Sequence, residues 1–280
     1  MTQQPSVVVG VDGSASSLAA VALAAREAHL RNAPLRILSA VPAMGGTVSY
    51  EEAQRSLTQA RYTVAGHRDI TTDVMTGGPA AVLIAAGQDA QLLVVGHRGR
   101  GGFKGLLAGS VATQVAEYAG CPVMIARDGP QLHTPEYPRL PVYLGVDIAD
   151  SAVAACAFAF TEAALRGVAL HALHAWTGHT RGDRPPPVFD REHDRAARTL
   201  AAHLAPVRAR YPDVDVYHEV ALEPARTALI SASCRAGLVV VGSHGPAGLT
   251  GIRIGSVSQA LIRRAHCPVV IAQPTAPAPG

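Results

Sequence analysis

A glycine-rich turn in the first half of the chain has the residues and spacing of an anion-binding site. Gly96, Gly99 and Gly109-Ser110 follow the apolar run Leu92–Val95 with the spacing Gly-x2-Gly-x9-Gly-Ser. A glycine backbone can turn sharply and approach a ligand closely. Gly109-Ser110 also immediately precedes a predicted helix, whose first free N–H groups favour phosphate. The pattern therefore predicts a phosphate site made of backbone donors.

Two side chains in this turn could add to the site. Arg98 could form a charge-assisted hydrogen bond to a phosphate oxygen, and the Ser110 hydroxyl could either cap the helix or bind phosphate. The alternative interpretation is that the glycines only shape a turn and a helix start.

The same arrangement occurs a second time, at Gly242, Gly245 and Gly255-Ser256, with His244 in the place of Arg98. Aligned without a gap at an offset of 146, residues 92–127 and 238–273 are identical at 16 of 36 positions. Chance does not explain a match of this length, so the chain contains a tandem repeat. The repeated spacing favours the binding interpretation for both turns.

Other phosphate-binding motifs are excluded. A Walker loop needs Gly-Lys-Ser/Thr, but the single lysine, Lys104, lies between Phe103 and Gly105. The dinucleotide fingerprint belongs after the first strand, where Gly10-Val11-Asp12-Gly13 lacks the third glycine. Kinase and dehydrogenase signatures are both missing from the sequence.

Catalytic and metal sites are not predicted. The phosphate turn has no convincing general base beside it, and no Ser-His-Asp arrangement is evident. His171 and His174 lie three apart in a predicted strand, so they point to opposite faces and do not predict a shared metal site. We expect a binding protein rather than an enzyme, with slow hydrolysis of a bound nucleotide left open.

Strand and helix patterns alternate through both halves. Ser6–Val11 is a continuous apolar run typical of a strand buried on both faces of a parallel sheet. The alternation predicts two tandem βαβαβαβαβ units, each an open parallel sheet of five strands with helices on both faces. Ligands of such sheets bind beyond the carboxyl ends of the strands. Asp12 and Asp147 stand at such ends beside the glycine turns, although either could instead cap a helix.

The proline-rich stretch 129–140 has no periodicity and predicts a linker. We expect a first domain at 1–128, a second at 141–273 and a disordered tail at 274–280. The second half carries about eleven extra residues in a loop around Arg181–Pro187, followed by a helix expected over Asp190–Arg210.

Bulk composition describes a globular protein. Hydrophobic residues make up 48% of the chain and charged residues 16%, and the net charge is only +3 without basic clusters, so a nucleic-acid surface is not expected. No secretory signal or membrane span is predicted. The four cysteines lack paired spacing, which indicates reduced thiols and a cytoplasmic protein.

These residues resemble the universal stress protein family. The resemblance rests on Val11-Asp12-Gly13-Ser14, on both glycine patterns and on the strands that follow Cys121-Pro122 and Cys267-Pro268, and it covers nearly the whole chain. In that family the glycine pattern separates ATP-binding members from the others. The resemblance implies Rossmann-like sheets of strand order 3-2-1-4-5 with an ATP cleft at the ends of strands one and four.

The resemblance also implies site residues. In the first half Asp12 would contact the base or ribose, Val41 would line the adenine pocket, and the remaining positions would hold ribose and phosphates: Val11, Val95, Gly96, Arg98, Gly99, Gly109, Ser110 and Val111. In the second half the corresponding residues are Val146, Asp147, Trp176, Val241, Gly242, His244, Gly245, Gly255, Ser256 and Val257. Trp176 replaces Val41 and could stack on adenine or fill its pocket, so we expect the second site to differ.

The functional expectation is an ATP-binding regulator of survival under stress or dormancy, with Mg²⁺ as a companion of ATP left open. The alternatives are a slow adenine-nucleotide hydrolase and a chaperone-like interaction module that does not use ATP. Exposed apolar edge strands invite pairing. We therefore expect the fifth strands, Pro122–Ala126 and Pro268–Ala272, to pair with each other or across a homodimer.

Overall fold

The computed structural model describes residues 4–43, 48–67, 69–100, 109–127, 133–148, 153–176, 186–243 and 254–273. Contacts between residues divide the chain into two compact units. The first comprises Met1–Arg127 and Pro268–Gly280, and the second comprises Asp128–Cys267. The expected disordered tail, 274–280, lies outside the described residues.

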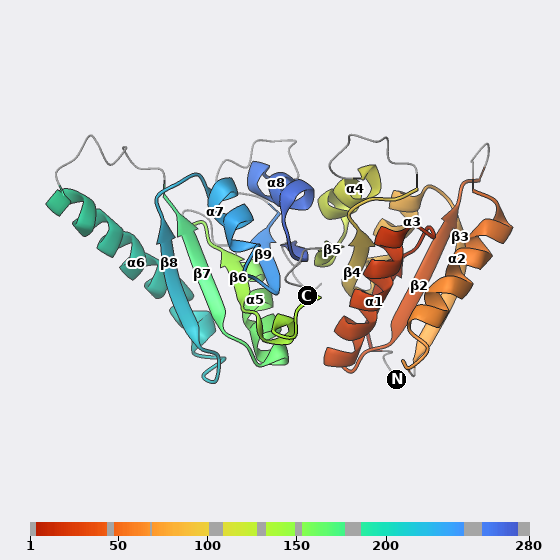
Figure 1. The fold of residues 1–280 in the computed structure, drawn as a ribbon, viewed down its shortest axis with the longest axis horizontal. Coiled ribbons are helices and arrows are strands. Elements are labelled where there is room, and N and C mark those ends of the chain that lie inside the picture. The colour runs from red at the N-terminus through yellow and green to blue at the C-terminus, as the bar shows by residue number, and fades with distance from the viewer. Residues whose placement is uncertain are drawn as a thin grey trace, which may run out of the picture. The chain divides into compact units, whose positions relative to one another are not determined.

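The first unit contains a mostly parallel sheet in the strand order β3-β2-β1-β4-β5-β10 (Figure 1). Its first five strands follow the expected order 3-2-1-4-5 and are parallel to their neighbours. The strands are β1 (Ser6–Gly10), β2 (Leu35–Val41), β3 (Ile70–Thr76), β4 (Ala90–Gly96), β5 (Val123–Ala126) and β10 (Val269–Ala272).

Helices cover both faces of this sheet. Helices α1 (Ala15–Leu30) and α2 (Tyr50–Thr63) contact one face, and α3 (Pro79–Ala86) and α4 (Ser110–Tyr118) the other. Helix α1 begins where Ser14 accepts a hydrogen bond from the backbone of Ser17. Helix α2 begins with a capping box between Ser49 and Glu52. Both caps position helices beside the carboxyl ends of the strands.

The second unit repeats this arrangement in the strand order β9-β6-β7-β8, with α5 and α6 on one face and α7 and α8 on the other. A 3-10 turn at Tyr137–Arg139 precedes it. The elements are β6 (Val142–Gly145), α5 (Val153–Arg166), β7 (Leu170–Ala175), α6 (Pro186–Arg208), β8 (Val216–Ala221), α7 (Ala225–Ala232), β9 (Leu238–Gly242) and α8 (Ser256–Arg264).

The prediction of two separate five-stranded sheets is wrong, because strand β10 pairs outside its own repeat. Although β10 ends the second repeat, it pairs antiparallel with β5 in the first unit, with Val270 opposite Met124. Both strands are fully buried, so the pairing covers an apolar edge that would otherwise be open. Pairing of the two fifth strands within the chain is confirmed.

Helix α6 also begins earlier than predicted. It starts at Pro186 rather than at Asp190, inside the stretch expected to be a loop, and it continues past Pro206. A proline in the first turn of a helix lacks only an N–H that has no helical partner there, so a helix can begin within a proline run.

Two packing features occur at matching places in both units. Gly10 and Gly145 end the first strand of each repeat, and a Cβ on either would lie 2.7 to 2.8 Å from a leucine methyl of α3 or α7. Helices α1 and α5 each carry a buried Glu–Arg ion pair one turn apart: Glu27 with Arg31, and Glu162 with Arg166. The repeats therefore share both close packing and buried charge.

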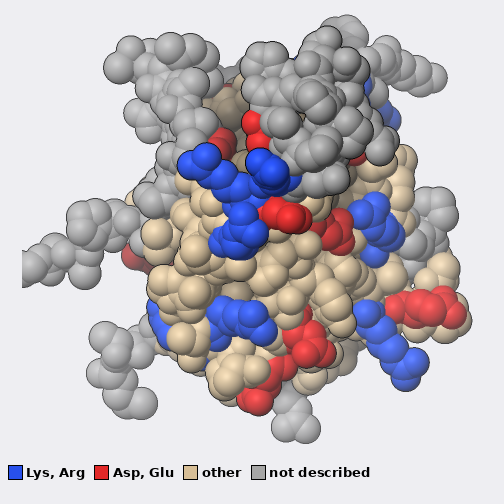
Figure 2. Space-filling model, turned by 90° about the vertical axis from the view of Figure 1, so that its left-hand side faces the viewer, with Lys and Arg blue, Asp and Glu red and all other residues tan. Residues whose placement is uncertain are grey.

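The surface carries both charge signs. On the face shown in Figure 2, basic and acidic side chains are interspersed. All four cysteines are free thiols, and burial raises the pKa of Cys121 to about 12 and that of Cys156 to about 11. Within the described residues, none of the helices combines the length and apolarity needed to cross a membrane.

Candidate nucleotide-binding site

Asp12 is the polar centre of the first candidate site. It directly follows β1 and is half-buried. Its Oδ1 accepts a hydrogen bond from the backbone of Ser14 at 3.0 Å, and its Oδ2 accepts one from the backbone of Arg100 at 2.7 Å. The helix cap is Ser14, so Asp12 is not the capping residue that the alternative interpretation proposed. Asp12 instead connects the end of β1 to the turn after β4.

The hydrogen bonds keep Asp12 ionised. Burial raises the pKa of its carboxyl, but hydrogen bonds from Ser14, from the backbone of Arg100 and from Ser17 outweigh burial, and the pKa lies below its ordinary value. A carboxylate in this state accepts hydrogen bonds, so Asp12 is suited to the hydroxyl groups of a ribose or to an amino group of a base.

The glycine turn after β4 folds against Asp12. A Cβ on Gly99 would lie 2.6 Å from Asp12 Oδ2, so a side chain at this position would displace the carboxylate. The backbone N–H of Gly109 donates to the carbonyl of His97 at 2.8 Å, and a Cβ on Gly109 would lie 3.8 Å from the Gly99 nitrogen. The structure therefore brings Gly99, Gly109 and Asp12 together.

Helix α4 begins at this point without a side-chain cap. Its N-cap is Gly109, which makes no side-chain hydrogen bond, and Ser110 is the exposed first residue of the helix. The prediction that Ser110 could cap the helix is wrong, because the cap position belongs to the residue before it. The free N–H groups at the start of α4 are suited to an anion.

Sequence reasoning missed Ser16 and His97. The hydroxyl of Ser16 lies 3.1 Å from His97 Nδ1 and accepts the backbone N–H of Arg98 at 3.3 Å, and His97 Nδ1 also lies 3.2 Å from the carbonyl of Ala126. The side chain of Arg98 is exposed. His97 and Ser16 therefore hold the glycine turn, and their contact across 81 positions left no signal in the sequence.

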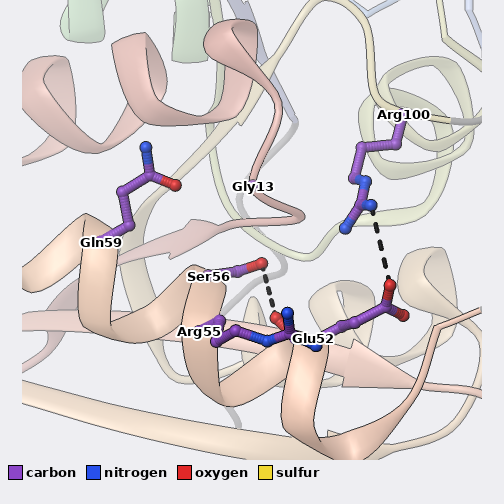
Figure 3. Close-up of a pocket in the computed structure, with 6 residues that line it drawn as sticks. All are labelled: Gly13, Glu52, Arg55, Ser56, Gln59 and Arg100. Carbon is purple, nitrogen blue, oxygen red and sulfur yellow. Dashed lines mark hydrogen bonds and ion pairs between the residues drawn. The ribbon is translucent and has the colours of Figure 1, made fainter.

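A cavity of about 280 Å³ lies beside Asp12. Figure 3 shows the residues that line it: Gly13, Glu52, Arg55, Ser56, Gln59 and Arg100. Arg100 extends from the turn after β4 toward Glu52 on α2, and Nη2 lies 3.9 Å from Oε1. The sequence prediction did not include this cavity. Its one sequence signal is the position of Arg100, immediately after Gly99.

The apolar residues of the predicted first site lie at strand ends and at a helix start. Val11 and Val95 are buried at the ends of β1 and β4, and Val111 is half-buried in the first turn of α4. Val41 is half-buried at the last position of β2, where its carbonyl accepts the N–H of Gly77 at 2.8 Å. Gly96 ends β4 so tightly that a Cβ would lie 2.8 Å from the carbonyl oxygen of Ser16.

The backbone of the second candidate site matches the first. The backbone N–H of Val146 donates to the carbonyl of Leu173 at 2.9 Å, and that of Val11 donates to the carbonyl of Leu38 at 2.8 Å. The N–H of Gly255 donates to Ser243 at 2.8 Å, which reproduces the bond from Gly109 to His97. Gly255 is also an N-cap without a side-chain bond. The exposed Ser256 and half-buried Val257 then begin α8, and Val241 and Gly242 end β9.

Side chains of the second site differ from those of the first. Trp176 follows β7 and is half-buried, and its backbone N–H donates to the carbonyl of Ala221 at 2.8 Å. His174 Nδ1 lies 3.0 Å from the carbonyl of Val146, where the first repeat has Ser39. Asp147 is half-buried after β6. His244 and Gly245 lie outside the described residues, so any counterpart of the Asp12–Gly99 contact does too.

The two histidines examined for a metal site have separate partners. His171 Nδ1 lies 2.6 Å from Glu219 Oε1, whereas His174 contacts a backbone carbonyl. Within the described part of the chain, no group of three or more His, Cys, Asp or Glu side chains is placed to hold a metal ion.

Comparison with known proteins identifies the family. The model of the universal stress protein family matches residues 5–127 and again residues 140–273. A universal stress protein of Mycolicibacterium smegmatis is 36% identical over 288 residues, covering 96% of this chain and 97% of that protein. Universal stress protein Rv2005c of Mycobacterium tuberculosis is 34% identical over 289 residues, covering 97% and 98%.

A solved structure agrees on the fold. The crystal structure of a universal stress protein from Archaeoglobus fulgidus superposes with a TM-score of 0.70 at 19% identity, covering 97% of this chain and 99% of that one. Identity at this level supports the α/β fold alone. Because the family model and the full-length relatives agree, the chain belongs to the universal stress protein family, as a tandem of two family domains.

Proposed function

We propose that the chain binds ATP and acts as a nucleotide-responsive regulator of survival under stress or dormancy in the cytoplasm. The observation that carries the proposal is the uncapped N-terminus of α4, which begins next to Gly99 and Asp12. The helix start supplies N–H donors for phosphate and Asp12 supplies an acceptor for the nucleoside. The glycine pattern that distinguishes ATP-binding members of the family is complete in both repeats.

The protein acts through binding rather than through fast chemistry. At the first site Asp12 is the carboxylate beside the glycine turn, and it is already engaged by the backbones of Ser14 and Arg100. A carboxylate held this way is a poor general base, because its lowered pKa makes it a weak proton acceptor. We expect release of phosphate from ATP to be slow, whether or not Mg²⁺ accompanies the nucleotide.

Titration with ATP, followed by calorimetry, tests the proposal directly. We expect binding at the first site, and the stoichiometry shows whether the second site binds as well. Trp176 is the single tryptophan of the chain and lies at the second site, so its fluorescence reports that site alone. A calorimetric signal without a change in fluorescence would assign the nucleotide to the first site. No heat of binding with ATP, ADP or AMP would refute the proposal.

We also propose a homodimer, formed through a surface other than the edge of β5. That edge is already covered by β10 within the chain. Sedimentation velocity over a range of concentrations tests this, and a chain that remains monomeric at the highest concentration would contradict it.

Changing Val123 and Val269 to Lys should loosen the pairing of β5 with β10 and lower stability, because both side chains are fully buried.

A further inference from the structure

Arg100 brings a positive charge to the first site that the glycine pattern does not include. It directly follows Gly99, and its backbone N–H is held on Asp12 at 2.7 Å, which determines where its side chain begins. The guanidinium lines the cavity beside α2, where a Cβ on Gly13 would lie 4.0 Å from Nη1. Figure 3 shows this side chain crossing from the turn to α2.

The ion pair that Arg100 forms in this cavity is weak. Its Nη2 lies 3.9 Å from Glu52 Oε1, near the limit for an ion pair, and the side chains are 50% and 31% exposed. Exposed pairs with such geometry contribute little to stability. A phosphate group carries more charge than a carboxylate and accepts parallel hydrogen bonds from a guanidinium, so it would compete well with Glu52 for Arg100.

The size and lining of the cavity suit part of a nucleotide. Its volume of about 280 Å³ falls just below the range of roughly 300–1,000 Å³ for pockets that enclose a small organic ligand. The lining includes two guanidinium groups, those of Arg55 and Arg100, and one carboxylate, that of Glu52. The guanidinium groups are suited to a phosphate group, while the nearby carboxylate of Asp12 is engaged by the backbone N–H groups of Ser14 and Arg100.

Gly99 lies between this cavity and the start of α4. A Cβ on Gly109 would lie 3.8 Å from the Gly99 nitrogen, and Arg100 is the next residue along the chain. Because Gly99 and Arg100 are consecutive, a phosphate chain bound at the start of α4 would have to extend past only this one residue to reach the guanidinium of Arg100.

We infer that Arg100, assisted by Arg55, is a specificity-determining residue that takes the terminal phosphates of a nucleoside polyphosphate, while Glu52 holds Arg100 in the nucleotide-free protein. The inference rests on the proposed function and adds a preference for polyphosphates over monophosphates. The second repeat has Pro246 at the position equivalent to Arg100. The preference therefore belongs to the first site.

The test compares ATP with AMP by calorimetry in the full chain and in three variants. Arg100→Gln should lower the affinity for ATP roughly tenfold and leave AMP nearly unchanged, since one charge-assisted contact is lost. Glu52→Gln should raise ATP affinity at low salt, because the competing carboxylate is gone. Arg61→Gln, on the exposed side of α2 away from the cavity, is the matched control and should change neither affinity.

Two further measurements distinguish the role of Arg100 from nucleotide binding as such. Inorganic tripolyphosphate should compete with ATP in the wild-type chain and much less in Arg100→Gln. Thermal unfolding without nucleotide should be similar in all variants, which shows that they fold. An unchanged ratio of ATP to AMP affinity in Arg100→Gln would overturn the inference and leave the proposed function standing. Failure of the wild-type chain to bind any adenine nucleotide would overturn both.

Discussion

The two repeats agree in their backbones and differ in the side chains around their candidate sites. The strand-end hydrogen bonds of Val11 and Val146 are equivalent, as are those of the helix-start residues Gly109 and Gly255. Trp176 nevertheless stands where the first repeat has Val41. The comparison teaches that the backbone of the two glycine turns can be kept while the side chains at the neighbouring strand ends change, because the glycine positions determine the first and not the second.

The same contrast holds between the second and third strands of each repeat, β2 with β3 and β7 with β8. In the first unit, Arg36 on β2 pairs with Asp73 on β3 at 3.0 Å. The matching positions of the second unit hold His171 and Glu219, and this pair is part of a larger cluster of side chains. Glu219 also accepts a hydrogen bond from Tyr143 at 3.1 Å and pairs with Arg235 at 3.2 Å. The ring of His171 stacks between those of Tyr143 and Tyr217, with centroid distances of 4.8 and 4.9 Å.

The largest effect should come from a feature that the repeats share. Changing Arg31 to Met removes the guanidinium that pairs with the buried carboxylate of Glu27, and Arg166→Met does the same for Glu162. We expect each change to destabilise its own unit by about 3–5 kcal/mol, the usual cost of breaking a buried pair. Urea unfolding combined with native-state hydrogen exchange reports each unit separately.

A matched double variant controls for the loss of charge. Replacing both members of one pair, as in Glu27→Leu with Arg31→Met, removes the buried carboxylate together with its cation. The double variant should lose less unfolding free energy than the single change. Clearly unequal losses from Arg31→Met and Arg166→Met would show that the two buried pairs are not equivalent, contrary to the comparison.

The next largest effect should come from Gly99, which is more tightly packed than Gly109 in the same glycine motif. Gly99→Ala places a Cβ 2.6 Å from Asp12 Oδ2, whereas a Cβ on Gly109 meets nothing closer than 3.5 Å. Gly99→Ala should therefore displace Asp12 and weaken nucleotide binding at the first site roughly tenfold or more, the loss of one charge-assisted hydrogen bond. Calorimetry measures this, and retention of wild-type affinity would argue against a role for Asp12.

Gly109→Ala is the companion variant. Its N-cap backbone has φ −74°, which any residue can adopt, so the nucleotide-free protein should fold normally. A loss of ATP binding in this variant would then come from the added methyl group at the start of α4, and not from misfolding of the protein.

Much of the fold was predictable because the strands and helices have periodic patterns. Runs such as Ser6–Val11 are local signals, and the alternation of strand and helix predicts the parallel sheets. The pairing of β10 with β5 was expected as one of two alternatives, since an exposed edge indicates pairing but neither the partner nor the antiparallel direction that the structure shows. The start of α6 at Pro186 was missed, because a proline run resembles a loop whether or not a helix begins in it.

The candidate site was predictable only in its backbone. Glycine spacing identified the turn, and the strand end identified Asp12, because both signals are short-range. The contact of Ser16 with His97 and the cavity between Arg100 and Glu52 join segments far apart in the chain. Such contacts depend on how α1 and α2 pack on the sheet, and a single sequence holds no record of that packing. Ser110 was read as a cap because serine favours that position, while the actual cap is Gly109.

A smaller effect should follow from the cluster found in the second unit. Burial raises the pKa of Glu219, but hydrogen bonds from His171 and Tyr143 and the charge of Arg235 outweigh burial and lower it below the ordinary value of 4.5. The unfolded chain therefore takes up this proton at a higher pH than the folded chain does. The stability from Glu219 is present above pH 4.5 and is lost as the pH falls through the folded pKa.

Glu219→Gln should remove that pH dependence and cost about 1–2 kcal/mol at neutral pH, since hydrogen bonds to a charged group are lost at a partly exposed site. Unfolding in urea at several values of pH measures both quantities, with hydrogen exchange in β7 and β8 assigning them to the second unit. A variant with the wild-type slope below pH 4.5 would show that Glu219 is not the responsible group.

The smallest effect should come from the matching position of the first unit. Arg36 and Asp73 form an ion pair whose side chains are 37% and 44% exposed, without the stacked rings of the second unit. Water and salt screen such a pair, so Asp73→Asn should cost no more than about 1 kcal/mol, and less at high ionic strength. The same urea measurement applies, and Glu219→Gln is its partner in the comparison. If Asp73→Asn cost as much as Glu219→Gln, the rings of Tyr143 and Tyr217 would add nothing to the second pair.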